Sequence, residues 1–399
     1  MQPMESYDAV VVGGGPAGAT AASDLAQQGR SVLLLDKAGR IKPCGGAVPP
    51  RLIRDFAIPD TLIVARARSA RIIAPSDRTV DMPIDGEGYV GMVDRCDFDE
   101  WLRRRAAMQG ADWRQGTFQH LTRDVQDRPV VTYRTREGGS VSVRARTVIG
   151  ADGANSAVVR EAFPEAEKIP FVFAYHEVVR SPQPTASQDA VFDGTRCDVY
   201  YQGRLSPDFY SWVFPHGDTA SIGTGTAVKG LSLRGAVDRL RRDAGLDGVE
   251  TLRCEGAPIP LRPRKRWDNG RDVLLAGDAA GVVAPASGEG IYYAMLGGRL
   301  AAEAVGEFLA SGDAKALAQA RRRFMKVHGR VFWILGIMQR FWYVNDQRRE
   351  RFVSICGDRD VQRLTWESYM NKELVRRDPL AHLRIFFKDL AHLFRLVSP

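Results

Sequence analysis

Hydrophobic and polar positions along this chain predict an α/β protein. Apolar runs at 9–12 and 31–35 lie on either side of a small-residue stretch, 17–27, that has helical spacing. Strand, turn, helix and strand in this order are typical of the first unit of a nucleotide-binding sheet. We therefore expect a parallel sheet to begin near the N-terminus.

Later segments add antiparallel strands and a helical end. Alternating stretches separated by turn residues predict two hairpins, 69–74 with 79–84 and 129–135 with 140–149. Strand patterns dominate between 170 and 226, in the segments 171–179, 198–202, 209–214 and 219–223. A short buried strand is expected at 272–276. Helical spacing is found at 51–56, 97–109, 231–244 and almost throughout the residues beyond 290.

The composition is that of a folded protein with a basic surface. The 399 residues are 44% hydrophobic and 26% charged, with a net charge of +8. The length allows two or three domains with buried cores. The positive charge is compatible with phosphates, acidic lipid headgroups or nucleic acid as partners, and equally with a solvated basic surface.

The cysteines and the chain ends indicate a cytoplasmic protein without a metal centre. The five cysteines lie far apart and form no CxxC motif or Cys/His cluster. We expect reduced thiols and no metal. Residues 1–8 are polar and predict no signal peptide, and the apolar stretch 331–344 is too short and too polar to span a bilayer.

The glycine-rich turn after the first strand carries the clearest chemical signal. Gly13-x-Gly15-x-x-Gly18 links the strand to the helix, and the second strand ends in Asp36. Such glycines allow a tight turn and the close approach of a pyrophosphate, while the terminal acid accepts from a ribose. The candidate dinucleotide-binding residues here are Gly13, Gly15, Ala17, Gly18, Asp36 and Lys37.

Two further segments follow the same logic. An apolar strand enters Asp152-Gly153, and another enters Gly277-Asp278. A strand-end aspartate can accept from hydroxyls, although Asp-Gly is also a common turn. The second segment continues to a loop that contains Pro285, Gly288 and Gly290.

This triple arrangement resembles the FAD-binding fold of the para-hydroxybenzoate hydroxylase class over about residues 5–300. The resemblance implies FAD as cofactor. It implies that the first glycines and Asp36 hold the ADP half, and that Asp278 holds the ribityl–phosphate part. Gly288 and Gly290 would lie near the isoalloxazine. Arg95 matches an arginine that reaches FAD in that class, and otherwise is a surface charge at a helix start.

Two more motifs resemble the geranylgeranyl reductase family. They are Pro43-Cys-Gly-Gly46 and Tyr210-Ser-Trp-Val-Phe-Pro215. Together with Lys42–Ala47 and the basic, aromatic C-terminal region they are most similar to its (bacterio)chlorophyll-synthesis members. The resemblance implies saturation of three isolated C=C bonds of a geranylgeranyl chain, on (bacterio)chlorophyll or on the diphosphate, to give phytyl.

The residues of both motifs suit that chemistry. Tyr210, Trp212 and Phe214 alternate and would share one side of a strand. With Pro215 they are candidates for binding an isoprenoid chain, and otherwise they belong to an ordinary sheet core. Gly45 and Gly46 would let the loop pass beside the flavin. Cys44 is a candidate proton donor, or shapes the cavity, or is a small buried residue.

We expect the FAD-binding domain to be discontinuous. A mainly antiparallel β-rich substrate domain is inserted into it, and a helical region follows. The expected boundaries are 1–65, 86–160 and 267–315 for the FAD domain, 66–85 and 161–266 for the substrate domain, and 316–399 for the helical region.

The electron donor is open between two options. No second GxGxxG follows the first. By family resemblance NADPH reduces the FAD, docking near Asp152-Gly153 and four basic residues, and a reduced ferredoxin is the other option. The basic residues are Arg262, Arg264, Lys265 and Arg266.

The C-terminal region, 321–396, is basic and aromatic. It either lies on an anionic photosynthetic or cytoplasmic membrane as a peripheral contact or packs on the protein itself. Its aromatic residues include Phe324, Phe332, Trp333, Phe341, Trp342, Tyr343, Phe386, Phe387 and Phe394.

Two other functions compete with the reductase hypothesis. One is an FAD-dependent monooxygenase of the same fold that acts on an aromatic or lipid substrate. The other is a non-catalytic pigment or lipid carrier. Nucleic-acid binding is not expected, because the basic residues are dispersed and form no recognised motif.

Overall fold

The computed structural model describes residues 4–37, 41–182 and 191–372. The chain divides into two compact units, each made of three segments. The first consists of the N-terminal segment up to Ile41, Cys96–Phe171 and Pro258–Trp333. The second consists of Lys42–Arg95, Val172–Ala257 and the described residues from Ile334 onward.

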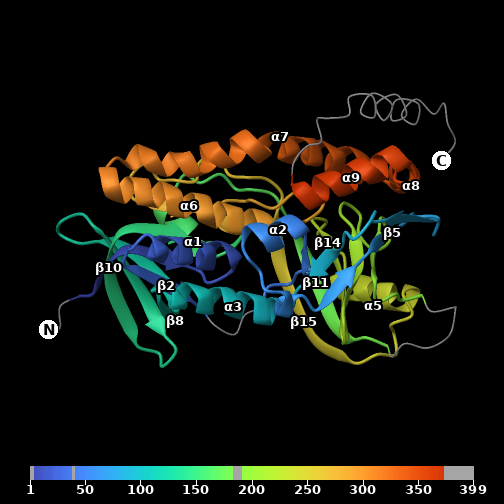
Figure 1. Ribbon diagram of the computed structural model, residues 1–399, viewed down its shortest axis with the longest axis horizontal. Helices are drawn as coiled ribbons and strands as arrows, with labels where there is room; N and C mark the ends of the chain where they lie inside the picture. The colour runs from blue at the N-terminus through green and yellow to red at the C-terminus, as the bar shows by residue number, and fades with distance from the viewer. Residues whose placement is uncertain (1–3, 38–40, 183–190, 373–399) are drawn as a thin grey trace. The chain divides into compact units, whose positions relative to one another are not determined.

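The first unit is built on a six-stranded sheet (Figure 1). Its strands β2, β1, β10 and β16 are parallel neighbours, with Val10 paired to Leu33 on one side and to Val148 on the other. Parallel strands are buried on both faces, which explains their unbroken apolar runs. The strands are β1 (Ser6–Val12), β2 (Val32–Asp36), β8 (Asp112–Arg123), β9 (Pro129–Thr135), β10 (Ser140–Gly150) and β16 (Val273–Leu275).

Two long strands of this sheet each pair in parallel at one end and antiparallel at the other. β8 pairs with β2 in parallel over Asp112–Gln115 and with β9 antiparallel from Gly116 onward. β10 pairs with β9 at its start and with β1 at its end. The hairpin expected at 129–149 therefore continues the parallel sheet.

Helices pack on this sheet through small or apolar side chains. α1 and α6 run side by side (Figure 1), because Gly298 lies against the carbonyl oxygen of Ala17. α3 contributes Phe98, Leu102 and Ala106, all without exposed surface. The helices are α1 (Pro16–Gln27), α3 (Arg95–Met108), α4 (Ala157–Ala162), α6 (Ile291–Ser311) and α7 (Ala318–Trp342), the last of which continues into the second unit.

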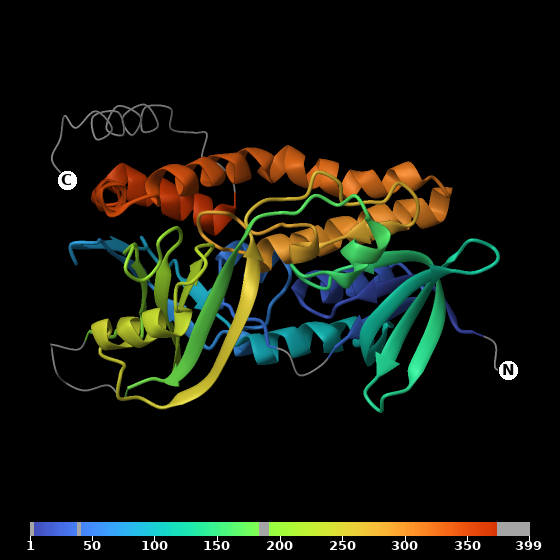
Figure 2. The same ribbon diagram turned by 180° about the vertical axis from the view of Figure 1, so that it is seen from behind.

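The second unit contains a large sheet, which Figure 2 shows from behind. Its seven strands are hydrogen-bonded in the order β15-β11-β14-β13-β12-β5-β6. β11, β14, β13 and β12 are successively antiparallel, and β12 pairs with β5 in parallel. The strands are β5 (Ser69–Ile73), β6 (Thr79–Pro83), β11 (Phe171–Arg180), β12 (Arg196–Tyr200), β13 (Ser211–His216), β14 (Thr219–Thr226) and β15 (Thr251–Pro260). A three-stranded sheet accompanies it: β3 (Ala47–Val48), β7 (Val90–Met92) and β4 (Ala65–Ala67).

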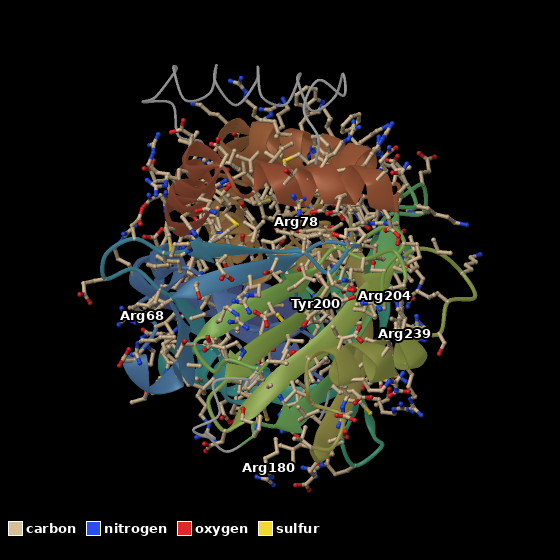
Figure 3. The ribbon with its side chains drawn as sticks, turned by 90° about the vertical axis from the view of Figure 1, so that its right-hand side faces the viewer. Arg68, Arg78, Arg180, Tyr200, Arg204 and Arg239 are labelled. Atoms are coloured by element: carbon tan, nitrogen blue, oxygen red, sulfur yellow. The ribbon has the colours of Figure 1, made fainter. Side chains whose placement is uncertain are left out.

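Helix α5 (Leu233–Asp243) covers one face of the large sheet. Val237 and Leu240 of the helix join a buried cluster with Tyr200, Val213 and Ile222 of the strands. Figure 3 shows Tyr200 within the sheet and Arg239 at the surface beside the helix. The remaining helices of this unit are α2 (Pro50–Asp55), α8 (Asp346–Ile355) and α9 (Arg359–Asn371).

Some expected elements differ from the observed ones. The predicted strand 209–214 runs instead from Ser211 to His216, so that Tyr210 precedes it. Strands β3, β4, β7, β8 and β15 and helix α4 were not predicted. The helices expected beyond 290 are observed as far as Asn371, and Phe386, Phe387 and Phe394 lie outside the described residues. Among the residues described, no helix combines the length and hydrophobicity that crossing a bilayer requires.

Candidate functional site: a flavin cradle and an aromatic row

The turn between β1 and α1 has the geometry that a pyrophosphate needs. Gly13 has a φ of 107°, and a side chain there would collide with the carbonyl oxygen of Ala151. Gly15 caps α1 without a side-chain hydrogen bond, and no described atom lies within 4 Å of where its Cβ would be. The helix therefore begins with free N–H groups beside open space, which fits an anionic phosphate. Gly18 packs against the carbonyl of Gly13.

Asp36 closes this turn from the end of β2. Its Oδ1 accepts from the Gly14 N–H at 3.0 Å, and its Oδ2 lies 3.5 Å from Nη1 of Arg103. Lys37 follows it and is exposed. The structure thus holds this carboxylate at the edge of the glycine turn, and its role toward a ribose stays a prediction.

Arg103 is a site residue that the sequence did not reveal. It comes from α3, pairs with Glu100 at 3.0 Å and lies over the Trp113 ring at 5.7 Å. It also donates to the carbonyl of Gly14 at 3.4 Å. Three consecutive arginines occupy 103–105, and nothing in the sequence singles out the one that faces the turn.

Asp152 has a local structural partner. Its Oδ2 accepts from the Ala157 N–H at 2.6 Å and from the Val158 N–H at 3.1 Å, and its Oδ1 accepts from Ser156 Oγ at 2.5 Å. The carboxylate thus caps α4. Burial raises its pKa, while the hydrogen bond from Ser156 opposes the rise. Its expected role toward a nucleotide, together with that of Gly153, stays a prediction.

The segment around Gly277 and Asp278 packs against helix α1, which follows the glycine turn. Gly277 has a φ of 61°, and its Cβ would lie 2.7 Å from that of Ala17. Asp278, which follows, is 8% exposed, and a Cβ on Gly290 would lie 4.0 Å from its Oδ1. Gly290 in turn caps α6. The structure therefore brings the glycine turn, Asp278 and Gly290 together in one unit.

The connecting loop and Arg95 complete the expected cofactor set. Gly288 donates to the carbonyl of Ala284 at 2.9 Å, in the turn that follows Pro285 and lies before Gly290. Arg95 begins α3 and is largely buried. The contacts of Pro285, Gly288 and Arg95 with FAD stay predictions.

Tyr210, Trp212 and Phe214 of the second unit lie next to one another and form an aromatic row. The ring centroids of Tyr210 and Trp212 lie 6.0 Å apart, and those of Trp212 and Phe214 lie 6.5 Å apart. Val213, between the last two, faces the α5 side of the sheet. The row therefore occupies the opposite face, and Pro215, the next residue, is buried.

The Pro-Cys-Gly-Gly loop lies directly on this row. A Cβ on Gly45 would come within 2.6 Å of Phe214 Cδ2 and 3.7 Å of Trp212 Nε1. Gly46 has a φ of 69°, and its N–H donates to Cys44 Sγ at 3.3 Å. Two motifs more than 160 residues apart in the chain thus form one surface.

His216 holds the loop in place and was not predicted from the sequence. Its Nε2 lies 3.1 Å from the carbonyl oxygen of Gly45. Burial lowers the pKa of His216 to about 4, and the hydrogen bond to Gly45 opposes the shift. The ring is therefore neutral at pH 7, with Nε2–H donating to the loop.

Comparison with known proteins assigns this architecture to a family. A family model described as an FAD binding domain matches residues 6–331. The geranylgeranyl diphosphate reductase of Rhodobacter capsulatus is 59% identical over 394 residues, which cover 98% of this chain and 99% of that protein. The chain belongs to the geranylgeranyl diphosphate reductase family.

More distant members of the geranylgeranyl diphosphate reductase family extend the match. The protein of that name from Synechocystis is 36% identical, over 96% of this chain and 97% of its own length. Among solved structures, a geranylgeranyl bacteriochlorophyll reductase-like protein from Thermoplasma acidophilum gives a TM-score of 0.82 at 23% identity, covering 97% of this chain and all of that one. A flavin-dependent brominase gives 0.75 at 19% identity, over 98% of this chain and all of its own. These two structural likenesses establish the fold.

Proposed function

We propose that this protein is an FAD-dependent geranylgeranyl reductase of (bacterio)chlorophyll biosynthesis. It saturates three isolated double bonds of a geranylgeranyl chain, on the pigment or on the diphosphate, to give phytyl. The observation that carries the proposal is the 59% identity, over nearly the full length of both chains, to a geranylgeranyl diphosphate reductase. The Pro-Cys-Gly-Gly loop seated on the aromatic row supports it.

The residues of the first unit fit FAD. Gly13, Gly15 and Gly18 would leave the helix start open to the pyrophosphate, Asp36 would accept from the ribose, and Asp278 with Gly290 would lie along the flavin half. Bound FAD, once reduced, supplies a hydride to one carbon of the double bond.

The residues of the second unit would align the chain and keep water out. Isolated alkenes have no carbonyl to polarise, so the second carbon must receive a proton from a positioned acid. Cys44, whose Sγ accepts from the Gly46 N–H and which precedes the glycine that lies against Phe214, is our candidate donor. A thiol that gives up its proton in each round must regain one from solvent before the next. Tyr210, Trp212 and Phe214 offer the apolar surface that an isoprenoid chain matches, and the strand alternation puts Pro215 on the opposite face, with Val213.

NADPH is the donor that we propose for the flavin, with a reduced ferredoxin as the alternative. Anaerobic mixing of the oxidised holoprotein with NADPH distinguishes the two. Loss of flavin absorbance supports the nucleotide, and an unchanged spectrum that bleaches only with reduced ferredoxin supports the protein donor.

The reaction itself is tested with purified holoprotein, NADPH and either geranylgeranyl-bacteriochlorophyll or geranylgeranyl diphosphate. Mass spectrometry should show products heavier by two, four and six hydrogens. The preferred substrate identifies whether the chain is reduced attached or free. Oxygen consumption with a hydroxylated product would instead support a monooxygenase, and no product with either donor would overturn the proposal.

A further inference from the structure

A buried hydrogen-bond chain crosses four strands of the second unit and ends on the aromatic row. Trp212 Nε1–H donates to Ser221 Oγ at 3.1 Å. Ser221 Oγ lies 3.0 Å from His176 Nδ1, and His176 Nε2 lies 2.5 Å from Glu255 Oε2. The four residues come from β13, β14, β11 and β15, which are consecutive in the sheet.

Strand register explains why these side chains meet. Gly223 of β14 pairs with Trp212 on one side and with His176 on the other. A side chain at Gly223 would collide with the indole, so the glycine lets the ring lie across β14 toward His176. The two ring centroids are 6.5 Å apart. Ser221, two residues earlier, shares the same face.

The carboxylate of Glu255, at the far end from Trp212, decides which atom donates in the hydrogen bond with His176. Glu255 can only accept when ionised, so His176 Nε2 carries the proton that it donates. Ser221 Oγ, which accepts from the indole N–H, links Trp212 to His176 Nδ1. Arg253 holds the other oxygen of Glu255 at 3.1 Å and also pairs with Asp94 at 2.7 Å.

Burial makes each of these bonds costly to lose. Trp212, His176 and Ser221 are each less than 5% exposed. A buried polar group that loses its partner has no water to replace it. The indole plane is therefore fixed more firmly than packing alone would fix it.

The order serine, histidine, carboxylate also occurs in hydrolases, but the placement here serves a different purpose. A nucleophilic serine must reach its substrate, whereas Ser221 is 1% exposed and its oxygen already accepts from Trp212. The hydrogen bonds of Ser221, His176 and Glu255 orient the indole, and the buried serine has no access to a scissile bond.

We propose that Ser221, His176 and Glu255 are positioning residues that fix the Trp212 ring and thereby the register of the isoprenoid chain along the row. This inference rests on the proposed function for its substrate, and on the hydrogen bonds alone for its effect on Trp212. Three successive reductions require the chain to be held at a new position each time. A loosened ring should release chains that are only partly reduced.

The first test reads the indole directly and needs no activity. The protein has seven tryptophans, and Trp212→Phe identifies the indole N–H resonance of Trp212 by its loss. Ser221→Ala should shift that resonance and speed its exchange with solvent at least about ten-fold, because the acceptor is gone. Ser221→Thr restores a hydroxyl and should keep both near wild type. Glu255→Gln should shift the same resonance by a smaller amount.

A matched control lies on the other face of the same strand pair. Ser211 Oγ bonds Thr224 Oγ1 at 2.8 Å, and both side chains are buried. Ser211→Ala removes an equally buried hydroxyl, which bonds Thr224, and leaves Ser221, His176 and Glu255 unchanged. The Ser211→Ala variant should leave the position of the Trp212 indole resonance unchanged. An equal shift in Ser211→Ala and Ser221→Ala would overturn the proposal.

The second test reads the products. Ser221→Ala should raise KM for the geranylgeranyl substrate about five- to ten-fold, with a smaller change in kcat. It should also increase the share of products that carry only two or four added hydrogens, and Ser221→Thr should reverse both effects. A changed indole resonance with unchanged KM and products overturns the role in chain register. Wild-type protein that reduces no geranylgeranyl chain overturns the proposed function, while the indole measurement still stands.

Discussion

At the scale of single residues, Gly45 is the loop glycine that lies against the aromatic row with no room for a side chain. Its backbone conformation is an ordinary one, so that contact with Phe214 alone forbids a side chain. Gly45→Ala should push the loop off the aromatic row and lower kcat at least about ten-fold, with a modest loss of stability. Steady-state kinetics and thermal unfolding measure the two effects.

Gly194→Ala is the control for this substitution. Gly194 also belongs to the second unit, and no described atom lies within 4 Å of its would-be Cβ. This variant should behave as wild type. Equal activities for both variants would show that the loop does not depend on its closeness to Phe214.

His216 links the loop to pH. Its pKa is about 4 in the folded protein and 6.5 when unfolded, so between these values the unfolded chain binds more protons. Stability therefore falls as the pH is lowered through this window, by up to about 3 kcal/mol from this group. His216→Gln keeps a donor for Gly45 and does not titrate. The free energy of unfolding of this variant should therefore fall less on acidification than that of the wild type. Urea unfolding at pH 7 and pH 4.5 measures both changes, and a constant difference between the two proteins would contradict this expectation.

The residues that carried a local signal were predictable, and those that act through distant partners were not. The glycine turn and the aromatic row are each indicated by the spacing of residues that lie close together in the sequence. Arg103, His176 and His216 are placed by pairing across strands or helices, and no local pattern marks them. The sequence contains six histidines, of which the structure shows that two flank the row.

At the scale of elements, the short helix α4 depends on its cap. Asp152 accepts from two of its first N–H groups and from Ser156. Asp152→Ala should lower the free energy of unfolding by about 1–2 kcal/mol. FAD affinity, measured by flavin fluorescence, should change less than about two-fold, since a Cβ remains and the turn at Gly13 is intact. Lost FAD affinity at unchanged stability would instead support the ribose role of this aspartate.

Helix α7 carries exposed apolar and basic side chains, and peripheral membrane contact through it stays a prediction. Its 25 residues include six lysines and arginines and no acidic residue. Trp333 and Ile337, which are 67% and 46% exposed, lie one turn apart on it beside cationic positions. Exposed apolar and basic side chains on one helix face favour binding at a lipid interface.

We expect the protein to bind vesicles that contain anionic lipid. Trp333→Ser with Ile337→Ser should weaken binding at least about ten-fold, because each large side chain contributes apolar area. Val125→Ser is the control, since Val125 is fully exposed in a turn of the first unit. Co-sedimentation measures all three proteins, and equal losses for the double variant and the control would contradict a specific contact by α7.

Elements with clear periodicity were predicted within a few residues, whereas five strands (β3, β4, β7, β8 and β15) and the short helix α4 were not predicted. β8 and β15 lack a clean alternation because many of their side chains are half-exposed on both faces. Each is held by long-range pairing, β8 to β2 and β9, which a local pattern does not record. Tertiary context therefore decided these elements.

At the scale of the whole molecule, each unit is assembled from three chain segments, so that a ligand in either one joins distant parts of the sequence. The glycine turn, Asp278 and Gly290 meet in the first unit, and the loop at Gly45 meets the aromatic row in the second. The proposed division into FAD, substrate and helical domains stays a prediction, since it assigns functions rather than contacts. Ligand binding offers a way to test it.

Hydrogen exchange should map the two ligands onto different segments. FAD binding stabilises what it contacts, by about 2.7 kcal/mol at a hundred-fold excess over Kd. FAD should therefore slow exchange in 13–18 and 276–290, and a geranylgeranyl substrate added to the holoprotein should further slow it in 43–46 and 210–216. α5 packs on the opposite face of the sheet from the row and should change little with either ligand. Substrate protection confined to α5, or FAD protection absent from the glycine turn, would place the ligands elsewhere and refute the assignment of the two sites.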